Sequence, residues 1–307
     1  MTAPAAGATG VAGGAGRSGG AVVLVIAGLA CQEVGASVAV LLFPQVGALG
    51  MVMLRLVFSA LILLAVARPG VRGHDRAAWA AVVRLGLALA VMNALFYLAL
   101  ERLPLGVTVT IEVLGPLTLS ILASRRASAW LWAALALAGV VALGGGGWDR
   151  LDVAGVLCAL GAAAMWALYI LSSARVGAEF AKLDGLALAM AIGALVSLPF
   201  GLATAGSVLL RFDLHVLGLV GLGAAVALLS STLPYAFELI ALRRLAASAF
   251  AILMSLAPAT ATLAGFVLLG QHVSVLEIAG IALVVVASIG AVRAAGRHAR
   301  EATAPLG

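Results

Sequence analysis

The stretch ALERLPLGVTVTIEVLGP, residues 99–116, aligns without gaps on ALRRLAASAFAILMSLAP, residues 241–258. Both copies begin with Ala-Leu-x-Arg-Leu, and they end on equivalent prolines, Pro116 and Pro258. A proline cannot donate the backbone hydrogen bond that continues a helix, so each copy predicts an apolar helix that is interrupted near its proline. The repetition predicts that two related halves are joined in one chain.

The composition is that of a membrane protein. Of the 307 residues, 64% are apolar and 10% are charged, whereas a soluble domain is about half apolar and roughly a quarter charged. A core of this size cannot bury so much apolar surface, which leaves lipid as the solvent. The net charge of +6 does not indicate a nucleic-acid partner, because the positive residues are spread between apolar runs and form no basic face.

Ten apolar runs have the length of a membrane span, for which about 20 residues are needed. Backbone in lipid must satisfy its hydrogen bonds internally, so each run is expected to be a helix. The runs lie near residues 20–43, 47–67, 78–100, 104–124, 127–146, 152–173, 184–205, 214–240, 246–269 and 274–292. We therefore predict an all-α, polytopic membrane protein with ten transmembrane helices arranged as two inverted five-helix repeats. The predicted divisions are a disordered tail (1–19), the first repeat (20–146), the second repeat (147–293) and a cytoplasmic tail (294–307).

The inversion follows from the number of spans, because an odd number in each half places the two copies in opposite orientations. A match of Ala138-Gly139 on Ala279-Gly280 continues the repeat. Inverted repeats with broken helices near the midplane are typical of secondary transporters. With both termini in the cytoplasm, fourteen Lys and Arg residues fall inside and three outside, as the positive-inside rule requires. Abundant Arg, Ala and Gly indicate a bacterial source, so the expected location is the bacterial inner membrane.

An acid at membrane depth is the first candidate site residue. Glu112 lies near the middle of the fourth span, and Thr108 shares its helical face one turn earlier. Pro116 cannot donate to the carbonyl group of residue 112, which leaves that oxygen open beside the carboxylate. This arrangement suits an ammonium group or a proton. The alternative is a structural acid that is paired with Arg55.

Two further charged residues inside spans leave alternatives open. Arg55 stays charged and can hold a carboxylate through two parallel hydrogen bonds, so it is a candidate clamp for a substrate carboxylate. It could equally extend towards the outer headgroups. Glu238 is a candidate lining residue of the pathway, or a boundary partner of Arg243 and Arg244.

Other polar and aromatic side chains within the spans are candidates for lining a pocket. A charged group at this depth usually faces a cavity or a partner, whereas aromatic residues at helical spacing more often pack between helices. The candidates are Gln32 and Glu33 in the first span, Asn93 and Tyr97 in the third, and Trp166 and Tyr169 in the sixth.

Enzymatic and metal chemistry have no support in the sequence. Cys31 and Cys158 lie inside apolar runs, which argues against a disulfide framework or a metal site. No GxxxxGK[ST] loop is present, and no His pair lies at membrane depth. We expect no enzyme activity, no cofactor and no metal, and transport driven by an ion gradient.

Four stretches give the chain a resemblance to a known family. They are LFPQVGALGMVMLRL (42–56), MNALFYLALERLPLGVTVTIEVLGPL (92–117), MWALYILSSARVGAE (165–179) and LSSTLPYAFELIALRRL (229–245). Together with the repeat, they resemble the drug/metabolite transporter superfamily of EamA type, and within it the threonine and homoserine exporter branch. The exporter-like motif VTVTIEVLGP places its acid at Glu112. The branch pattern has Gln at position 32 followed by a small residue, so Glu33 is a departure.

The resemblance implies an exporter of small amino acids similar to threonine or homoserine, driven by proton antiport with alternating access. Glu112 and Glu33 are then the candidates for proton coupling. The expected partners are the amino-acid substrate, protons and the lipid bilayer, and a homodimer is left open. The alternatives are an EamA-type exporter of another metabolite or a drug, and a non-transporting membrane sensor or assembly protein.

Overall fold

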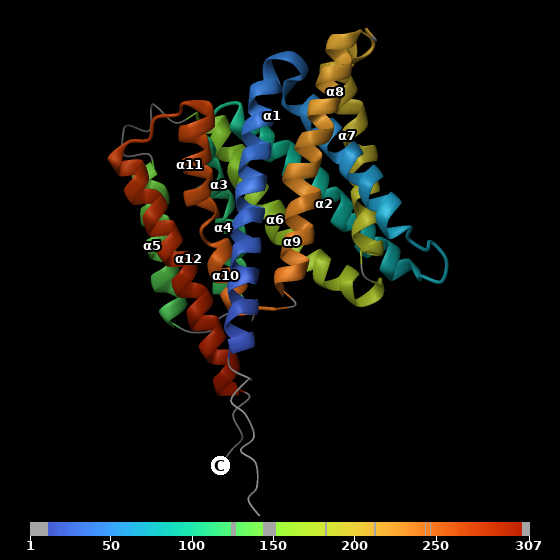
Figure 1. Ribbon diagram of the computed structural model, residues 1–307. Helices are drawn as coiled ribbons and strands as arrows, with labels where there is room; N and C mark the ends of the chain where they lie inside the picture. Colours follow the sequence, from blue (N-terminus) through green and yellow to red (C-terminus); the bar gives the residue numbers. More distant parts are fainter. Residues whose placement is uncertain are drawn as a thin grey trace, which may run out of the picture.

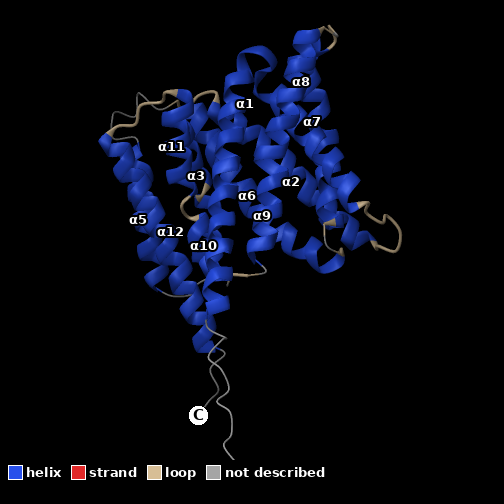
Figure 2. Cartoon of the chain, in the orientation of Figure 1, coloured by secondary structure: helices blue, strands red, loops and turns tan. Residues whose placement is uncertain are grey.

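The computed structural model describes residues 12–123, 127–143, 152–181, 183–211, 213–242, 244–245 and 247–302. Over these ranges the regular structure is entirely helical and contains no strand (Figure 2). The predicted connections at 124–126 and 144–150, and residues 1–11 and 303–307 of the predicted tails, lie outside the described residues. The all-α prediction is confirmed.

Twelve α-helices and one π-helical turn follow one another through the described ranges. In chain order they are α1 (Ala12–Ala67), α2 (Arg76–Leu100), α3 (Leu105–Glu112), α4 (Leu114–Ala123), α5 (Ala127–Leu143), α6 (Val153–Glu179), α7 (Asp184–Leu209), α8 (Leu214–Ala227), η2 (Leu228–Thr232), α9 (Leu233–Leu242), α10 (Ala247–Met254), α11 (Ala257–Leu269) and α12 (Val275–Ala302). Eight helical segments of the described chain are long and apolar enough to cross a membrane, and Trp130–Leu143 forms a shorter apolar helix. The protein is therefore polytopic.

Helix α1 contains two of the predicted apolar runs. Its apolar part spans 48 residues, Gly20–Ala67, which at about 1.5 Å per residue exceeds twice the thickness of a hydrocarbon core. Pro44 lies inside it, and Gly47 leaves the helical conformation with φ of 70° and ψ of 164°. The chain reverses direction within α1 (Figure 1). After this break, the N–H of Ala48 donates to Glu101 Oε1 at 3.0 Å, so a loop carboxylate caps the restarted helix.

The first and last helices extend into the ranges that were predicted as tails. Helix α1 begins at Ala12 and not at residue 20, and α12 continues to Ala302, beyond the predicted boundary at 293. The start of α1 and the end of α12 lie at the same end of the bundle (Figure 1).

Three helical runs are interrupted within the bundle. The fourth predicted run breaks at Val113, between α3 and α4, and the ninth breaks between Met254 and Ala257. Pro116 lies in the first turn of α4, and Pro258 lies in the first turn of α11. N–H groups in the first turn have no hydrogen-bond acceptor within their own helix, so a proline is tolerated there. The eighth run contains the π-helical turn η2 between α8 and α9.

The halves of the chain interdigitate. Helix α1 contacts α7, α8 and α9, while α2 contacts α6 and α7 (Figure 1). Helix α3 contacts α11, and α5 contacts α12. In the last pair, a Cβ atom built on Gly139 would lie 2.7 Å from the carbonyl oxygen of Gly280, and one on Gly280 would lie 2.6 Å from that of Gly139. Only glycine allows the two backbones to approach so closely.

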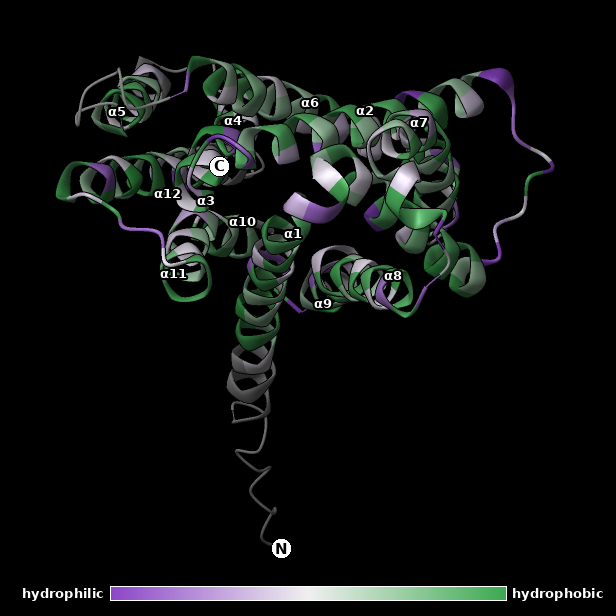
Figure 3. Ribbon diagram, turned by 90° about the horizontal axis from the view of Figure 1, so that it is seen from above, coloured by the Kyte–Doolittle hydropathy of each residue, from purple (hydrophilic) through white to green (hydrophobic). Residues whose placement is uncertain are grey.

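The outer surface is apolar. Large side chains such as Trp130, which is 72% exposed, Leu131 and Leu217 point away from the bundle. Seen along the bundle, hydrophobic residues cover most helix surfaces, and hydrophilic residues concentrate in the connections (Figure 3). Such a large exposed apolar surface is unfavourable in water and is typical of a protein that is surrounded by lipid.

Polar contacts tie the connections together at the end of the bundle opposite the termini. The N–H of Gly155 donates to Asp152 Oδ1 at 2.8 Å, and Arg102 Nη1 lies 3.2 Å from Asp152 Oδ2. The Gly155 hydrogen bond, assisted by Arg102, lowers the pKa of the Asp152 carboxyl group. The carboxylate thus caps α6 and links it to the loop after α2.

Candidate functional site

One large cavity, of about 860 Å³, lies between the two halves. This volume is in the range of small-molecule sites. Its wall comes from α1, α2, α3, α4, α6, η2, α9, α10, α12 and the break between α10 and α11. Nine residues singled out from the sequence line it: Gln32, Glu33, Arg55, Asn93, Glu112, Pro116, Trp166, Tyr169 and Glu238.

Three predicted residues do not line this cavity. Thr108 is fully buried, and its hydroxyl group donates to the carbonyl of Pro104 at 3.0 Å. A threonine that bonds back to the preceding turn has no donor left for a ligand. Tyr97 is also fully buried, behind Arg55, and Pro258 is buried at the start of α11. A direct contact of Thr108 or Tyr97 with a substrate in this cavity is therefore not supported.

Arg55 is held in the cavity wall by three hydrogen bonds. Nε donates to Ser231 Oγ at 3.3 Å, Nη2 donates to the carbonyl of Ser230 at 3.0 Å, and Nη1 donates to the hydroxyl of Tyr97 at 3.3 Å. The guanidinium carbon also lies 5.6 Å from the centre of the Tyr97 ring, a distance typical of a cation–π contact. Arg55 is thus directed into the protein, and extension towards the headgroups is not what the geometry shows.

The carboxylates of the cavity do not neutralise Arg55 directly. Arg55 and Glu112 both line the cavity, but the ion pair found within the described residues joins Arg102 and Asp152. Within the described residues, no ion pair joins Glu112 to Arg55 in this conformation. The second alternative is a boundary ion pair of Glu238 with Arg243 and Arg244. Arg243 lies outside the described residues, and the ion pairs within the described chain do not join Glu238 to Arg244.

Glu33 is the most buried of the acids, with 1% of its surface exposed. Among the described residues, neither of its carboxylate oxygens has a hydrogen-bond partner. A buried charge without a partner is costly, so the carboxyl group requires a proton or a cation from outside the chain. With Glu33, Glu112 and Glu238, the described wall of the cavity carries three carboxylates and one guanidinium.

Several lining residues were not singled out from the sequence. The polar ones are Ser120, Ser230, Tyr235, Ser255 and Ser288, and the apolar ones include Met92, Phe96, Phe250 and Met254. The run SSTLPY at 230–235 was the available signal, because hydroxyl groups next to a proline are unusual inside an apolar span. The other serines carry no such signal, since a single serine inside a membrane helix usually bonds to its own backbone.

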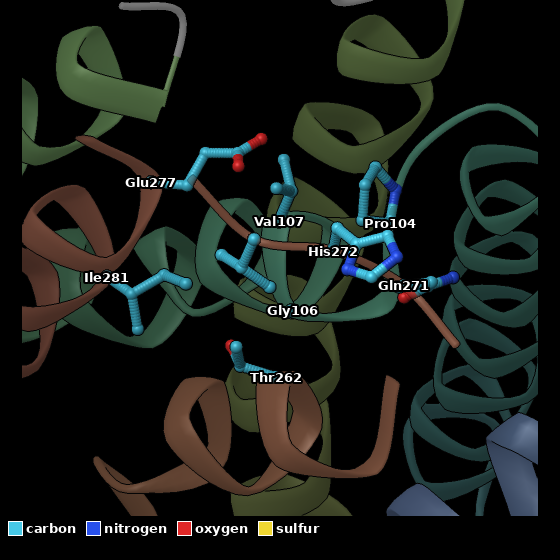
Figure 4. A pocket seen from close by; sticks show the side chains of 9 residues that line it. Pro104, Gly106, Val107, Thr262, Gln271, His272, Glu277 and Ile281 are labelled. Atoms are coloured by element: carbon cyan, nitrogen blue, oxygen red, sulfur yellow. The ribbon is translucent and has the colours of Figure 1, made fainter. Parts of the chain in front are cut away.

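A second and much smaller hollow lies at the opposite end of the bundle. It has a volume of only about 10 Å³ and lies among Pro104, Gly106, Thr262 and Gln271 (Figure 4). Gln271 Oε1 accepts from the N–H of Leu105 at 3.0 Å, so the loop after α11 caps the start of α3. A Cβ atom on Gly106 would collide with Thr262. This space holds about one water molecule and no substrate.

A bundle of apolar helices around a cavity of this size, with charged side chains in a mostly apolar wall, is typical of a polytopic membrane transporter. Residues 153–293 match the EamA-like transporter family. The chain is 38% identical over 271 residues to the threonine/homoserine exporter RhtA of Escherichia coli. This aligned region covers 88% of this chain and 90% of that protein. It is 39% identical over 270 residues to the threonine/homoserine exporter RhtA of Salmonella typhimurium, covering 87% and 89%. The chain belongs to the EamA family of drug/metabolite transporters, so it is a membrane transporter and not an enzyme.

A solved structure also shares the fold. It is a crystal structure of another protein, with a TM-score of 0.59 and 21% sequence identity, and the match covers 91% of this chain and 99% of that chain. At this identity the likeness concerns the fold alone. The resemblance seen in the four sequence stretches is confirmed by the family match and by the two exporters.

Proposed function

We propose that this protein exports small amino acids similar to threonine or homoserine across the bacterial inner membrane, in exchange for protons. The observation that carries this proposal is the presence of Arg55 and Glu112 in one cavity without an ion pair between them. A zwitterionic amino acid has an ammonium group for the acid and a carboxylate for the guanidinium. Two curated relatives are exporters of threonine and homoserine by name.

In this proposal, Glu112 binds the substrate ammonium group from one side of the membrane and a proton from the other. Glu33, which has no partner within the described chain, is the second group for proton coupling. Asn93, Gln32, Trp166 and Tyr169 line the same cavity and supply hydrogen-bond donors and aromatic surface around the cargo, and Glu238 adds a second-half carboxylate.

We propose ten membrane crossings as two inverted five-helix repeats, with boundaries at 20–146 and 147–293. The length of α1 and its break at Gly47 support counting it as two crossings. The helix contacts also occur in repeat-related sets: α1 with α7, α3 with α11 and α5 with α12 each join equivalent spans. The mutual approach of Gly139 and Gly280, which are equivalent in the repeat, supports the same symmetry.

Both termini lie in the cytoplasm in this proposal. The cavity then extends towards the cytoplasm, because Ser120, Phe250 and Val292 line it near the ends of α4, α10 and α12 that lie with the termini. In this proposal the periplasmic end, where the hollow among Gln271 and Gly106 measures only about 10 Å³, is closed. This is the loading state of an exporter, and rocking of the two halves would open the other side.

The proposal is tested in proteoliposomes that contain the purified protein and labelled threonine, with an imposed pH gradient. We expect gradient-driven movement of threonine that Glu112→Gln abolishes, while Glu179→Gln, an exposed position at the end of α6, transports like the parent. Equal transport by Glu112→Gln and the parent would refute the coupling role of Glu112. Without any threonine or homoserine movement, the choice of cargo is wrong.

The competing cargo is another metabolite or a drug, since the fold hosts more than one substrate class. Competition of many unlabelled solutes against one transported substrate separates these cases. A non-transporting sensor or assembly protein would confer no resistance to excess threonine, homoserine or a toxic analogue when expressed in cells.

A further inference from the structure

The turn η2 interrupts the helical hydrogen bonding of the eighth run at the cavity wall. The N–H of Leu233 donates to the carbonyl of Leu228, five residues back, which is the π-helical pattern. Pro234 follows at once, and it has no N–H to donate to the carbonyl of Ser230, four residues earlier. The sequence thus leaves one carbonyl oxygen without its helical donor. Single π-turns inside α-helices are frequent at functional sites.

The open carbonyl is occupied by Arg55. Nη2 of Arg55 donates to the carbonyl of Ser230 at 3.0 Å, and Nε donates to the neighbouring Ser231 Oγ at 3.3 Å. These acceptors lie 175 and 176 residues away along the chain, in the other half. Gly35 on α1 allows the close approach, since a Cβ atom there would collide with the side chain of Ser230.

The remaining donors of the guanidinium match a carboxylate. Arginine has five N–H groups. Three are donated to Ser231, Ser230 and Tyr97, which leaves one on each terminal nitrogen without an acceptor in the described chain. One N–H group on each terminal nitrogen can bind the two oxygens of a carboxylate.

We infer that η2 and Pro234 are a positioning element for Arg55, which orients its two remaining N–H groups to bind the α-carboxylate of the cargo. This inference rests on the proposed function, of which it specifies the carboxylate subsite. The subsite is assembled across the two halves, because Arg55 lies on α1 of the first and its acceptors lie on η2 of the second. A displacement of the halves relative to each other would alter the orientation of Arg55 and weaken its hold on the carboxylate.

Two variants remove the positioning without removing Arg55. Pro234→Ala restores an N–H that competes with Arg55 for the carbonyl of Ser230, and Ser231→Ala deletes the acceptor of Nε. The matched controls are Pro199→Ala, an exposed proline inside α7, and Ser59→Ala, a buried serine on α1 that does not line the cavity. Ser231→Thr keeps the hydroxyl group and is the conservative variant.

The first measurement compares binding of threonine with binding of threoninol, in which a hydroxymethyl group replaces the carboxylate. We expect Pro234→Ala and Ser231→Ala to weaken threonine binding about tenfold, a difference of about 1.4 kcal/mol, and to leave threoninol binding unchanged. The maximal rate at saturating threonine should change less than twofold, and Ser231→Thr should bind threonine like the parent. Equal weakening of both ligands, or no weakening of threonine, would overturn the carboxylate role.

The second measurement does not depend on the cargo. The Nε–H resonance of Arg55, assigned by its loss in Arg55→Lys, should exchange with water at least about tenfold faster in Pro234→Ala and Ser231→Ala than in the parent and both controls, because a lost hydrogen bond opens that group. If exchange is unchanged, η2 does not position Arg55. If the parent binds no amino acid but exchange behaves as expected, the proposed function fails and the positioning element stands.

Discussion

The broken helices of the first and second halves are interrupted at matching positions, but they carry different side chains at the break. The first breaks at Val113, and the second breaks between Met254 and Ala257, at the equivalent place in the repeat. Glu112 and Met254 are equivalent, and both line the cavity. The repeat therefore fixes where the backbone bends towards the cavity, while the side chain at that bend differs between an acid and a thioether.

The same contrast holds one turn earlier. Thr108 is buried and bonds to its own helix, whereas its equivalent Phe250 lines the cavity. The two matching stretches place bends on two sides of one cavity, and a binding site for an asymmetric molecule needs different groups on the two sides. An amino acid has one cationic end and one anionic end, so a cavity with twofold-symmetric chemistry would bind it poorly.

The strongest test exchanges the two residues at the bends. In Glu112→Met combined with Met254→Glu, we expect export to fall about 10- to 150-fold, because a charge-assisted hydrogen bond of about 1.5–3 kcal/mol is lost. The exchange also moves the coupling acid from α3 to α10. The measurement is the initial rate of threonine movement under a pH gradient. Met254→Leu alone is the control and should stay within about threefold of the parent. Export at the parental rate would mean that the halves are chemically interchangeable.

A second test asks whether Glu33, which like Glu112 lies in the first half, also takes part in proton coupling. Glu33→Gln should lower gradient-driven export about tenfold, roughly 1.4 kcal/mol, because an amide cannot take up and release the proton. Glu238→Gln, in the second half, should weaken threonine binding but keep the dependence on the gradient. Export rates measured at several imposed gradients separate the two. If Glu33→Gln retains the parental dependence, coupling resides elsewhere.

Stability measurements test whether the backbone contact between Gly139 and Gly280 is symmetric. Gly139→Val and Gly280→Val should each lower the unfolding free energy by about 1–3 kcal/mol through overpacking, and by similar amounts, because each Cβ would meet the carbonyl of the other glycine. Thermal unfolding in detergent provides the measurement. Gly218→Ala, where a Cβ meets nothing within 4 Å, is the control. A large effect at one glycine and none at the other would contradict a symmetric contact.

The smallest effect on transport is expected at the equivalent positions Thr108 and Phe250, of which only Phe250 lines the cavity. Thr108→Val should leave the KM for threonine within twofold, since the hydroxyl group is already bonded to Pro104. Phe250→Ala, at the equivalent position, should raise the KM about threefold, or roughly 0.6 kcal/mol, because it enlarges the cavity. Transport kinetics in proteoliposomes decide between them. A larger effect at Thr108 would place that side chain in the site after all.

The sequence identified most polar residues of the cavity because membrane depth makes them conspicuous. A carboxylate such as Glu33 or Glu112 in an apolar run must face a cavity or a partner, whatever the details of the fold. It did not reveal Ser230 as an acceptor for Arg55, since that contact bridges 175 residues. Nor did it separate Thr108 from Glu112, because a spacing of four residues places both on one helical face but does not say which packs against another helix.

By itself, the sequence determined that the protein is helical and polytopic, because lipid permits few alternatives for long apolar runs. The matching residues at 99–116 and 241–258 are the sequence basis for the proposed repeat. The tertiary structure decided which candidates share one cavity and what holds Arg55 in place. The physical reason is distance along the chain: hydrophobicity and proline act locally, whereas the orientation of the guanidinium depends on a carbonyl group contributed by the opposite half.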